Sequence, residues 1–214
     1  MPRVTIEGVR PEVDGGRYPV KRARGEEVLV EADVFADGHD VVACELLFRF
    51  LGEKNWQTVP MQFLGNDRWG AAFRVEKLGR YEYTVRGWTD PLQTWKRDLE
   101  KRKAAQQDIS VDLQIGAEIE KRAERAVAYY DKVLEVVVDP PRARFSSWYE
   151  MFPRSARGDG THGTFRDVIA RLPYVAELGF DVLYLPPIHP IAVTARKGRN
   201  NDLGARPGDL GSPW

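Results

Sequence analysis

The chain has 214 residues, of which 43% are hydrophobic and 30% are charged, and its 32 Lys and Arg residues balance 32 Asp and Glu residues. The zero net charge gives no electrostatic reason to expect nucleic acid or an anionic membrane as a partner, and the single cysteine, Cys44, excludes an internal disulfide and is expected to be an inert core thiol. The first residues lack the apolar stretch of a secretory signal, and no run of about 18 apolar residues predicts a transmembrane helix, so we expect a cytoplasmic protein.

The first part of the chain has the pattern of a β-sandwich. Short runs rich in β-branched and aromatic residues alternate with turn signals, and residues 81, 83 and 85 are predicted to face one way while 82, 84 and 86 face the other. The predicted strands are Val28–Phe35, Val41–Phe50, Trp56–Phe63, Trp69–Val75 and Tyr81–Trp88. Strands at this spacing favour a sandwich of the immunoglobulin-like type.

A helical pattern follows the predicted strands. Trp95–Gln107 is rich in helix-forming residues, and apolar residues then recur in steps of three and four, which places them on one helical face, either of a second helix or of a continuation of the first. That face consists of Ile115, Ile119, Ala123, Ala126, Tyr130 and Val133. Leu134–Val138 is predicted to return to the sheet, and Pro140 and Pro141 mark a domain boundary. The first domain is therefore expected to cover residues 1–139, with a helical insert at about 99–132.

The last third of the chain has the pattern of α/β structure. Phe145–Phe152 is a predicted strand, Thr164 and Asp167 predict a capping box, and Phe180–Leu185 is mostly apolar, as a buried parallel strand should be. The predicted buried stripe of the helix is Val168, Ile169, Leu172, Val175 and Ala176, and Gly179 is predicted to end it. One βαβ unit is therefore expected, followed by a long loop of the kind in which α/β barrels keep their active sites.

Several long strings of the sequence occur in one characteristic order. They are Val9–Gly16, Glu31–Asp40, Trp88–Trp95, Ser147–Ser155, Pro186–Ile191 and Arg196–Asn201. These strings resemble the α-1,4-glucan:maltose-1-phosphate maltosyltransferases of glycoside hydrolase family 13, and the resemblance runs along essentially the whole chain. It implies a multidomain fold: the N-terminal sandwich, then residues 143–214 as the first βαβ unit of an incomplete (β/α)8 barrel.

The resemblance also implies an activity. Members of the family transfer maltosyl units from maltose 1-phosphate to the non-reducing end of α-1,4-glucans, releasing phosphate by a retaining double displacement between two carboxylates. It implies no cofactor and a homodimer, although the helical insert is shorter than in the family. Because the family's catalytic carboxylates follow later barrel strands, we expect the chain to be a truncated N-terminal fragment that contains no catalytic residue and is inactive alone.

A few polar residues are candidates for the substrate site. By resemblance, Lys197 lines the donor maltosyl pocket, and Asn200 and Asn201 are weaker candidates that equally suit turn hydrogen bonds. His189 is expected to be structural, and Glu150 to support its strand. The three histidines do not have the spacing of metal ligands, so no metal site is predicted.

The sequence leaves alternatives open, both for the role of some residues and for the function of the chain. Four tryptophans of the first domain have a shape suited to stacking on glucan, although such residues in a sandwich more often belong to the core. They are Trp56, Trp69, Trp88 and Trp95. The alternative functions are another family 13 enzyme, such as a trehalose synthase or branching enzyme, and a non-catalytic glucan-binding or dimerisation module.

Overall fold

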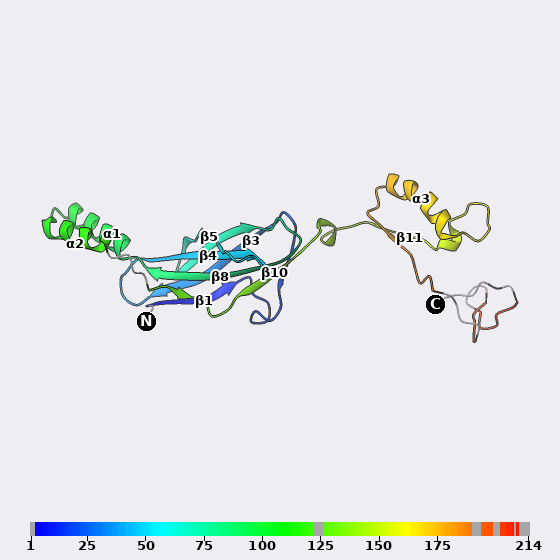
Figure 1. Cartoon of the computed structure of the whole chain (residues 1–214), viewed down its shortest axis with the longest axis horizontal. Coiled ribbons are helices and arrows are strands. Elements are labelled where there is room, and N and C mark those ends of the chain that lie inside the picture. The colour runs from blue at the N-terminus through cyan, green and yellow to red at the C-terminus, as the bar shows by residue number, and fades with distance from the viewer. Residues whose placement is uncertain (1–2, 122–125, 190–193, 199–201, 208, 210–214) are drawn as a thin grey trace. The chain divides into compact units, whose positions relative to one another are not determined.

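The computed structural model describes residues 3–121, 126–189, 194–198, 202–207 and 209 (Figure 1). The chain divides into two compact units, Met1–Ala143 and Arg144–Trp214. Within the described residues, every helix is too short or too polar to cross a membrane.

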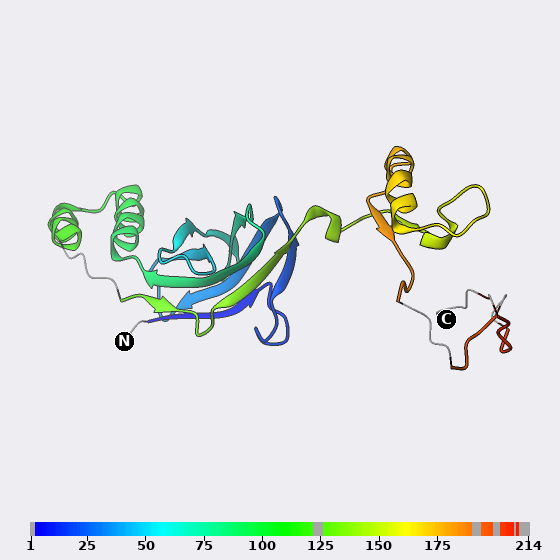
Figure 2. The same cartoon turned by 45° about the vertical axis from the view of Figure 1, so that its right-hand side comes forward.

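The first unit contains two sheets that enclose one core (Figure 2). The first sheet has the order β1 (Val4–Arg10), β3 (Glu27–Ala36), β7 (Arg68–Arg74) and β6 (Gln62–Gly65). The second has the order β2 (Val20–Ala23), β10 (Leu134–Asp139), β8 (Gly79–Thr89), β4 (Val42–Phe50) and β5 (Gln57–Pro60), and β9 (Ala128–Tyr129) also pairs with β8. Neighbouring strands in both sheets are antiparallel except for the parallel pair β10–β2.

Alternation along the strands decides which side chains form the core. In β3, every second residue from Val28 to Val34 is at most 1% exposed, because successive side chains of a strand point to opposite faces. In the facing sheet, Tyr81, Tyr83 and Val85 of β8 are buried in the same cluster, which confirms the predicted inward face.

The only cysteine lies in this core, on β4. Cys44 is 3% exposed, and burial raises the pKa of its thiol to about 12, with the neighbouring Glu45 adding to the effect. The thiol therefore stays protonated and shielded from reagents in solution. This confirms the prediction of an inert core thiol.

The predicted third strand, Trp56–Phe63, is wrong as a single element. The chain pairs with β4 up to Pro60, and then Gln62 pairs with Gly70 of β7 in the opposite sheet. Between them, Met61 is buried and its backbone N–H donates to the Cys44 carbonyl at 3.0 Å. The segment is therefore a corner at which the chain changes sheets, and a continuous run of strand-forming residues does not reveal such a corner.

Two helices, α1 (Pro91–Ala104) and α2 (Ser110–Lys121), follow β8 and lie beyond its end (Figure 2). Helix α1 begins earlier than predicted because the Asp90 carboxylate accepts a hydrogen bond from the Gln93 N–H at 3.0 Å and Pro91 occupies the first helical position.

The predicted continuation of this helical face to Val133 is wrong. Helix α2 ends at Lys121, and Ala128 and Tyr129 form β9, in register with Gly87 and Arg86 of β8. Ala128 is buried there, so its apolar side chain belongs to the sheet and not to a helix. Ala123 of the predicted face lies outside the described residues.

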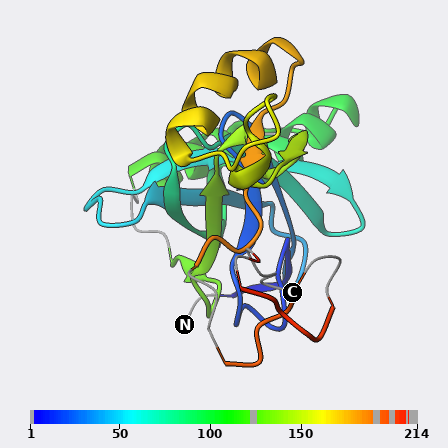
Figure 3. The ribbon, with the colours of Figure 1, turned by 90° about the vertical axis from the view of Figure 1, so that its right-hand side faces the viewer.

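The second unit is built around one parallel strand pair. It comprises β11 (Trp148–Glu150), a 3-10 turn at Pro153–Ser155, α3 (Phe165–Glu177) and β12 (Val182–Tyr184), whereas the 3-10 turn at Pro141–Ala143 ends the first unit. The two strands pair in parallel register, and α3 lies on one side of them (Figures 1 and 3). This arrangement is the predicted βαβ connection, with strands shorter than the sequence pattern suggested.

Helix α3 begins and ends at the predicted residues. The Asp167 carboxylate accepts hydrogen bonds from the Thr164 N–H and hydroxyl, both at 2.7 Å, and Gly179 follows the helix with a φ of 82°.

The predicted buried stripe of α3 is only partly correct. Val168 and Val175 are buried, but Ile169 and Leu172 are 63% and 42% exposed, and Ala176 is also exposed. Two short strands are too narrow to cover a whole helical face, so the apolar pattern exceeds the area that this unit buries.

Candidate functional site

The second unit carries a pocket of about 320 Å³ at the carboxyl ends of its parallel strands. Its lining comes from the loop after β11 and from the segment after β12. The lining residues are Phe152, Pro153, Arg154, His162, Gly163, Thr164, Phe165, Pro187, Ile188 and His189. Because parallel strands end at the same edge, two segments distant in sequence contribute to one pocket.

Gly163 closes the first of these loops on itself. Its N–H donates to the Arg154 carbonyl at 2.9 Å, and a Cβ at this position would lie 2.5 Å from the Pro153 carbonyl oxygen. A larger residue would therefore push the two ends of the loop apart. The loop is compact, and Ala156 at its centre is 8% exposed.

The chemistry of the pocket is basic and aromatic. Arg154 lies over the ring of Phe152, with its guanidinium carbon 4.9 Å from the ring centroid, and His162 and His189 line the same pocket. None of the described lining residues carries a carboxylate. Sequence reasoning missed Arg154 and His162. The sequence did contain one indication of their role, because both residues lie in the loop that follows a predicted parallel strand.

The loop that contains Lys197 lies further along the same unit. Lys197 is half-buried, and the neighbouring Gly198 donates its N–H to the Asp202 carbonyl at 2.7 Å. A Cβ on Gly198 would meet the Asp209 carboxylate at 3.0 Å, so the loop returns closely onto itself. Asn200 and Asn201 lie outside the described residues.

The two acids near the strands lie at opposite ends of the parallel pair. Glu150 is the last residue of β11 and is exposed, whereas Asp181 precedes β12. The Asp181 carboxylate accepts hydrogen bonds from the N–H and hydroxyl of Ser147 at 3.0 and 3.2 Å, which joins the starts of the two strands. Within the described residues, three potential metal ligands do not come together anywhere.

The four tryptophans have structural contacts. The Trp69 indole N–H donates to the Val34 carbonyl at 3.0 Å, and the Trp95 indole N–H donates to the Asp112 carbonyl at 2.7 Å. Trp88 is 8% exposed, and Trp56 packs against the Arg49 guanidinium at 4.3 Å. These contacts support the core and interface role over glucan stacking.

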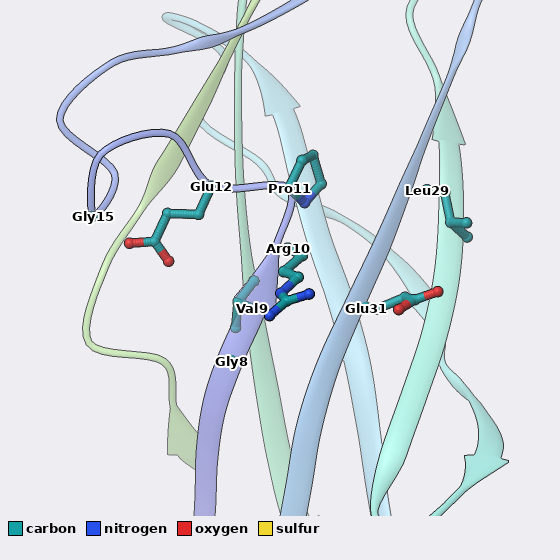
Figure 4. Close-up of a pocket in the computed structure, with 8 residues that line it drawn as sticks. All are labelled: Gly8, Val9, Arg10, Pro11, Glu12, Gly15, Leu29 and Glu31. Carbon is teal, nitrogen blue, oxygen red and sulfur yellow. The ribbon is translucent and has the colours of Figure 1, made fainter.

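A wider pocket of about 530 Å³ lies on the first unit between β1 and β3 (Figure 4). In this view Arg10 lies between Glu12 and Glu31. The Glu12 carboxylate accepts hydrogen bonds from Lys132 Nζ at 2.9 Å and from the Tyr130 hydroxyl at 3.0 Å, and Lys132 lowers its pKa. Glu12 therefore holds its loop against the segment before β10. The pocket at the carboxyl ends of β11 and β12 remains the better candidate for a functional site.

A pocket at the carboxyl ends of parallel strands is where α/β enzymes bind their ligands, so the second unit has the form of part of such an enzyme. Comparison with known protein families specifies the family to which the chain belongs. The family model for alpha-1,4-glucan:maltose-1-phosphate maltosyltransferase, domain N/S, matches residues 2–155. The chain belongs to this family.

Individual relatives agree with the family match. The chain is 45% identical to the alpha-1,4-glucan:maltose-1-phosphate maltosyltransferase of Chlorobaculum tepidum, 43% to that of Myxococcus xanthus and 38% to that of Pseudomonas aeruginosa. These alignments cover 99%, 99% and 100% of the chain but only 38%, 40% and 39% of the relatives. The chain thus spans about two fifths of the length of these relatives.

The alignments are also longer than the chain. The match with the Chlorobaculum tepidum protein extends over 258 positions, whereas the chain has 214 residues, a difference of 44. The relative therefore contains at least that many positions without a counterpart here.

Proposed function

We propose that the chain is the N-terminal part of a retaining glycosyltransferase. The enzyme would transfer maltosyl units from maltose 1-phosphate to the non-reducing end of α-1,4-glucans and release phosphate. The observation that carries the proposal is the 43–45% identity to two named maltosyltransferases along 99% of the chain. Maltose 1-phosphate and an α-1,4-glucan acceptor are accordingly the proposed substrates.

The proposal assigns a role to each unit. Residues 1–139, with the helical insert at about 99–132, would form an immunoglobulin-like domain, and residues 143–214 would begin a (β/α)8 barrel. The parallel β11–β12 pair supports the second assignment. The exposed apolar side chains of that unit also support it, for example Trp148, which is 58% exposed, and Ile169, which is 63% exposed. Further strands and helices of a barrel would cover such side chains.

Lys197 is the proposed substrate-binding residue, with Asn200 and Asn201 as secondary candidates. Its support is the resemblance of the surrounding string and the closed form of its loop, which restricts where the ammonium can reach. An ammonium at this position would donate hydrogen bonds to sugar hydroxyls or to the donor phosphate.

The groups that break and form the glycosidic bond are proposed to lie outside this chain. Retention requires two carboxyl groups about 5 Å apart, one as nucleophile and one as acid and then base. The described lining of the pocket carries no carboxylate, and Glu150 and Asp181 lie at opposite ends of their strands. We therefore expect the 214-residue chain to bind ligand without catalysing transfer.

The proposal includes a homodimeric, cytoplasmic parent enzyme. Helix α2 supports association, because Val111, Leu113 and Ile115 are 65%, 51% and 47% exposed and are suited to a protein contact. Light scattering of the parent enzyme would measure its mass. The mass of a monomer would contradict this part of the proposal.

The decisive experiment compares two proteins. The parent enzyme that begins with this chain and the 214-residue chain alone are each incubated with maltose 1-phosphate and glycogen, and released phosphate and glucan length are measured. We expect the parent to release one phosphate for each maltosyl unit added, and the chain alone to release none. Trehalose formation from maltose by the parent would contradict the proposed function, and phosphate release by the chain alone would contradict the location of the catalytic groups.

A further inference from the structure

We propose that residues 161–164 form a preformed wall of the pocket between the loops after β11 and β12, and that Arg157 is a positioning residue that holds this wall in place for the donor substrate. The inference rests on the proposed function, since it adds a residue to the proposed binding of maltose 1-phosphate. Arg157 is not one of the residues that line this pocket, so it can affect the ligand only through the wall.

The wall faces the segment that leads to the proposed donor site. Residues 162–164 line the pocket from the loop after β11, and residues 187–189 line it from the segment after β12. Lys197, the proposed substrate-binding residue, follows His189 by eight positions. The position of the wall therefore decides how much room a ligand has where the chain enters the proposed donor-binding loop.

One guanidinium joins the two ends of the wall. The Arg157 Nη1 group donates a hydrogen bond to the Thr161 hydroxyl at 3.3 Å, and its Nε–H donates to the Asp167 carboxylate at 3.1 Å. The same carboxylate accepts hydrogen bonds from the N–H and hydroxyl of Thr164, both at 2.7 Å. Arg157 thus holds one end of the wall directly and the other through the cap of helix α3.

The wall is also held at its middle. The Gly163 N–H donates to the Arg154 carbonyl at 2.9 Å, and a Cβ on Gly163 would lie 2.5 Å from the Pro153 carbonyl oxygen. At the first end, the Asp159 carboxylate accepts from the N–H and hydroxyl of Thr161 at 2.9 and 2.6 Å. Contacts along its whole length therefore fix the wall before a ligand arrives.

Such a preformed wall has a definite effect on binding. A site that is in its binding conformation only part of the time binds its ligand with an affinity reduced by that fraction. The Arg157 side chain is 45% exposed, and an ion pair of this kind contributes little to the stability of a fold. Loss of the guanidinium should therefore loosen the wall without unfolding the unit.

The test measures phosphate release by the parent enzyme. We expect Arg157→Ala to raise KM for maltose 1-phosphate about tenfold and to leave kcat nearly unchanged, because a bound donor still reacts once the wall is in place. Arg157→Lys should raise KM less, since an ammonium can face Asp167 but lacks the second arm that reaches Thr161.

Controls separate this role from a general effect of lost charge. Arg166→Ala should change neither constant, because Arg166 is an exposed cation in the first turn of the same helix and does not line the pocket. Thr161→Val removes the hydroxyl that Arg157 contacts, so Arg157→Ala should have a smaller effect in the Thr161→Val background than alone.

Amide hydrogen exchange reports the wall itself. In the Arg157→Ala enzyme, residues 156–163 should exchange faster, whereas the amides of the buried Val168 and Val175 should keep their protection. Faster exchange at Val168 and Val175 as well would mean that Arg157 only supports the fold, and it would overturn the proposal.

The kinetic results can also overturn it. An unchanged KM, a loss confined to kcat, equal effects of Arg157→Ala and Arg166→Ala, or full additivity with Thr161→Val would each exclude a positioning role. The proposed function fails separately: if the parent enzyme released no phosphate but converted maltose to trehalose, the activity would be wrong. The same variants would then be measured with maltose, and the same rise in KM would sustain the role of Arg157.

Discussion

At the residue scale, two polar side chains of the second unit have distinct roles. Asp167 caps helix α3: it accepts two hydrogen bonds from Thr164 and pairs with Arg157. Lys197 has its role proposed from the resemblance of its surroundings, and the structure adds that it is half-buried in a loop that closes on itself. Both positions lead to tests of single substitutions.

Replacing Lys197 by Met in the parent enzyme is expected to raise KM for maltose 1-phosphate and to lower kcat/KM about tenfold to a hundredfold, because a charged donor to the substrate is lost. Steady-state phosphate release measures both constants. Arg206→Met is the matched control, since Arg206 is an exposed cation of the same loop. Unchanged kinetics for the Lys197 variant would remove this residue from the substrate site.

The Asp167 carboxyl is expected to titrate near pH 2. Its hydrogen bonds with the Thr164 side chain and backbone, and then Arg157, lower its pKa from 3.8 to about 2. A pKa that is lower in the folded state stabilises the fold above the unfolded value, and this contribution is lost as pH falls from about 4 to 2. Carboxyl NMR gives the midpoint. Asp167→Asn should remove the stability change between about pH 4 and 2, and the control Glu177→Gln should keep it. A titration midpoint of Asp167 near pH 4 would contradict the capping interaction.

At the element scale, the pairing of α1 and α2 depends on the absence of a side chain at Gly116. Trp95 of α1 donates its indole N–H to the Asp112 carbonyl of α2 at 2.7 Å, and a Cβ on Gly116 would overlap the indole ring. Arg102 and Asp112 add an ion pair at 2.5 Å between the same helices. A short helix pair with few buried residues thus obtains its geometry from one close approach.

Gly116→Ala is therefore expected to destabilise the helix pair by about 1–3 kcal/mol through overpacking, although alanine favours an isolated helix by about 1 kcal/mol over glycine. Amide hydrogen exchange of α2 measures the effect, and faster exchange should be confined to α1 and α2. Gly158→Ala is the matched control, because nothing lies within 4 Å of a Cβ built at Gly158. Slower exchange of α2 in the Gly116 variant would show that the indole ring does not restrict it.

At the scale of the whole molecule, the two units differ in how much apolar surface they bury. The main core cluster contains only residues of the first unit, from Val4 to Val138. In the second unit, Val168 and Val175 are buried, while Phe145 and Ile169 are 82% and 63% exposed. The first unit therefore has a core of its own, and the second presents apolar side chains that are suited to further contacts.

Residues 1–143 alone are expected to fold cooperatively, since their core needs nothing from the second unit. Thermal unfolding followed by near-ultraviolet circular dichroism would show a single sharp transition. In this protein, Leu46→Ala, at a fully buried position, should cost about 2–5 kcal/mol, whereas Leu78→Ala, at a position 46% exposed, should change stability by about 0.5 kcal/mol or less. A broad transition, or equal effects of the two variants, would show that the first unit lacks an independent core.

Much of the local structure was predictable because local signals determine it. Alternation predicted β3, β4 and β8, and the residue types at 164, 167 and 179 predicted both ends of α3. The strands β1 and β2 were missed because their short, polar-rich runs owe their conformation to neighbours in the sheet. The extended helical face failed for a related reason, since Ala128 and Tyr129 form a strand only because β8 is beside them.

The site was predictable in part, through the general rule that loops after parallel strands carry function. That rule indicated the correct end of the strands in the second unit, and the resemblance indicated Lys197. Arg154 and His162 were not predicted as site residues, because a glycine-rich polar loop has the same composition whether it is solvated or closed around a pocket. Their proximity depends on the Gly163 hydrogen bond, which composition does not show.

The family, the strongly periodic strands and helices, and the order of a β-rich part before a βαβ part follow from the residues alone, because they depend on local patterns and on long matching strings. Three features became visible only in the folded chain: Trp56–Phe63 divides between two sheets, two helices meet at Gly116, and His162 and His189 share a pocket with Arg154. Each of these depends on contacts between residues distant in the chain. Such contacts form only where packing and backbone hydrogen bonding bring separate segments together.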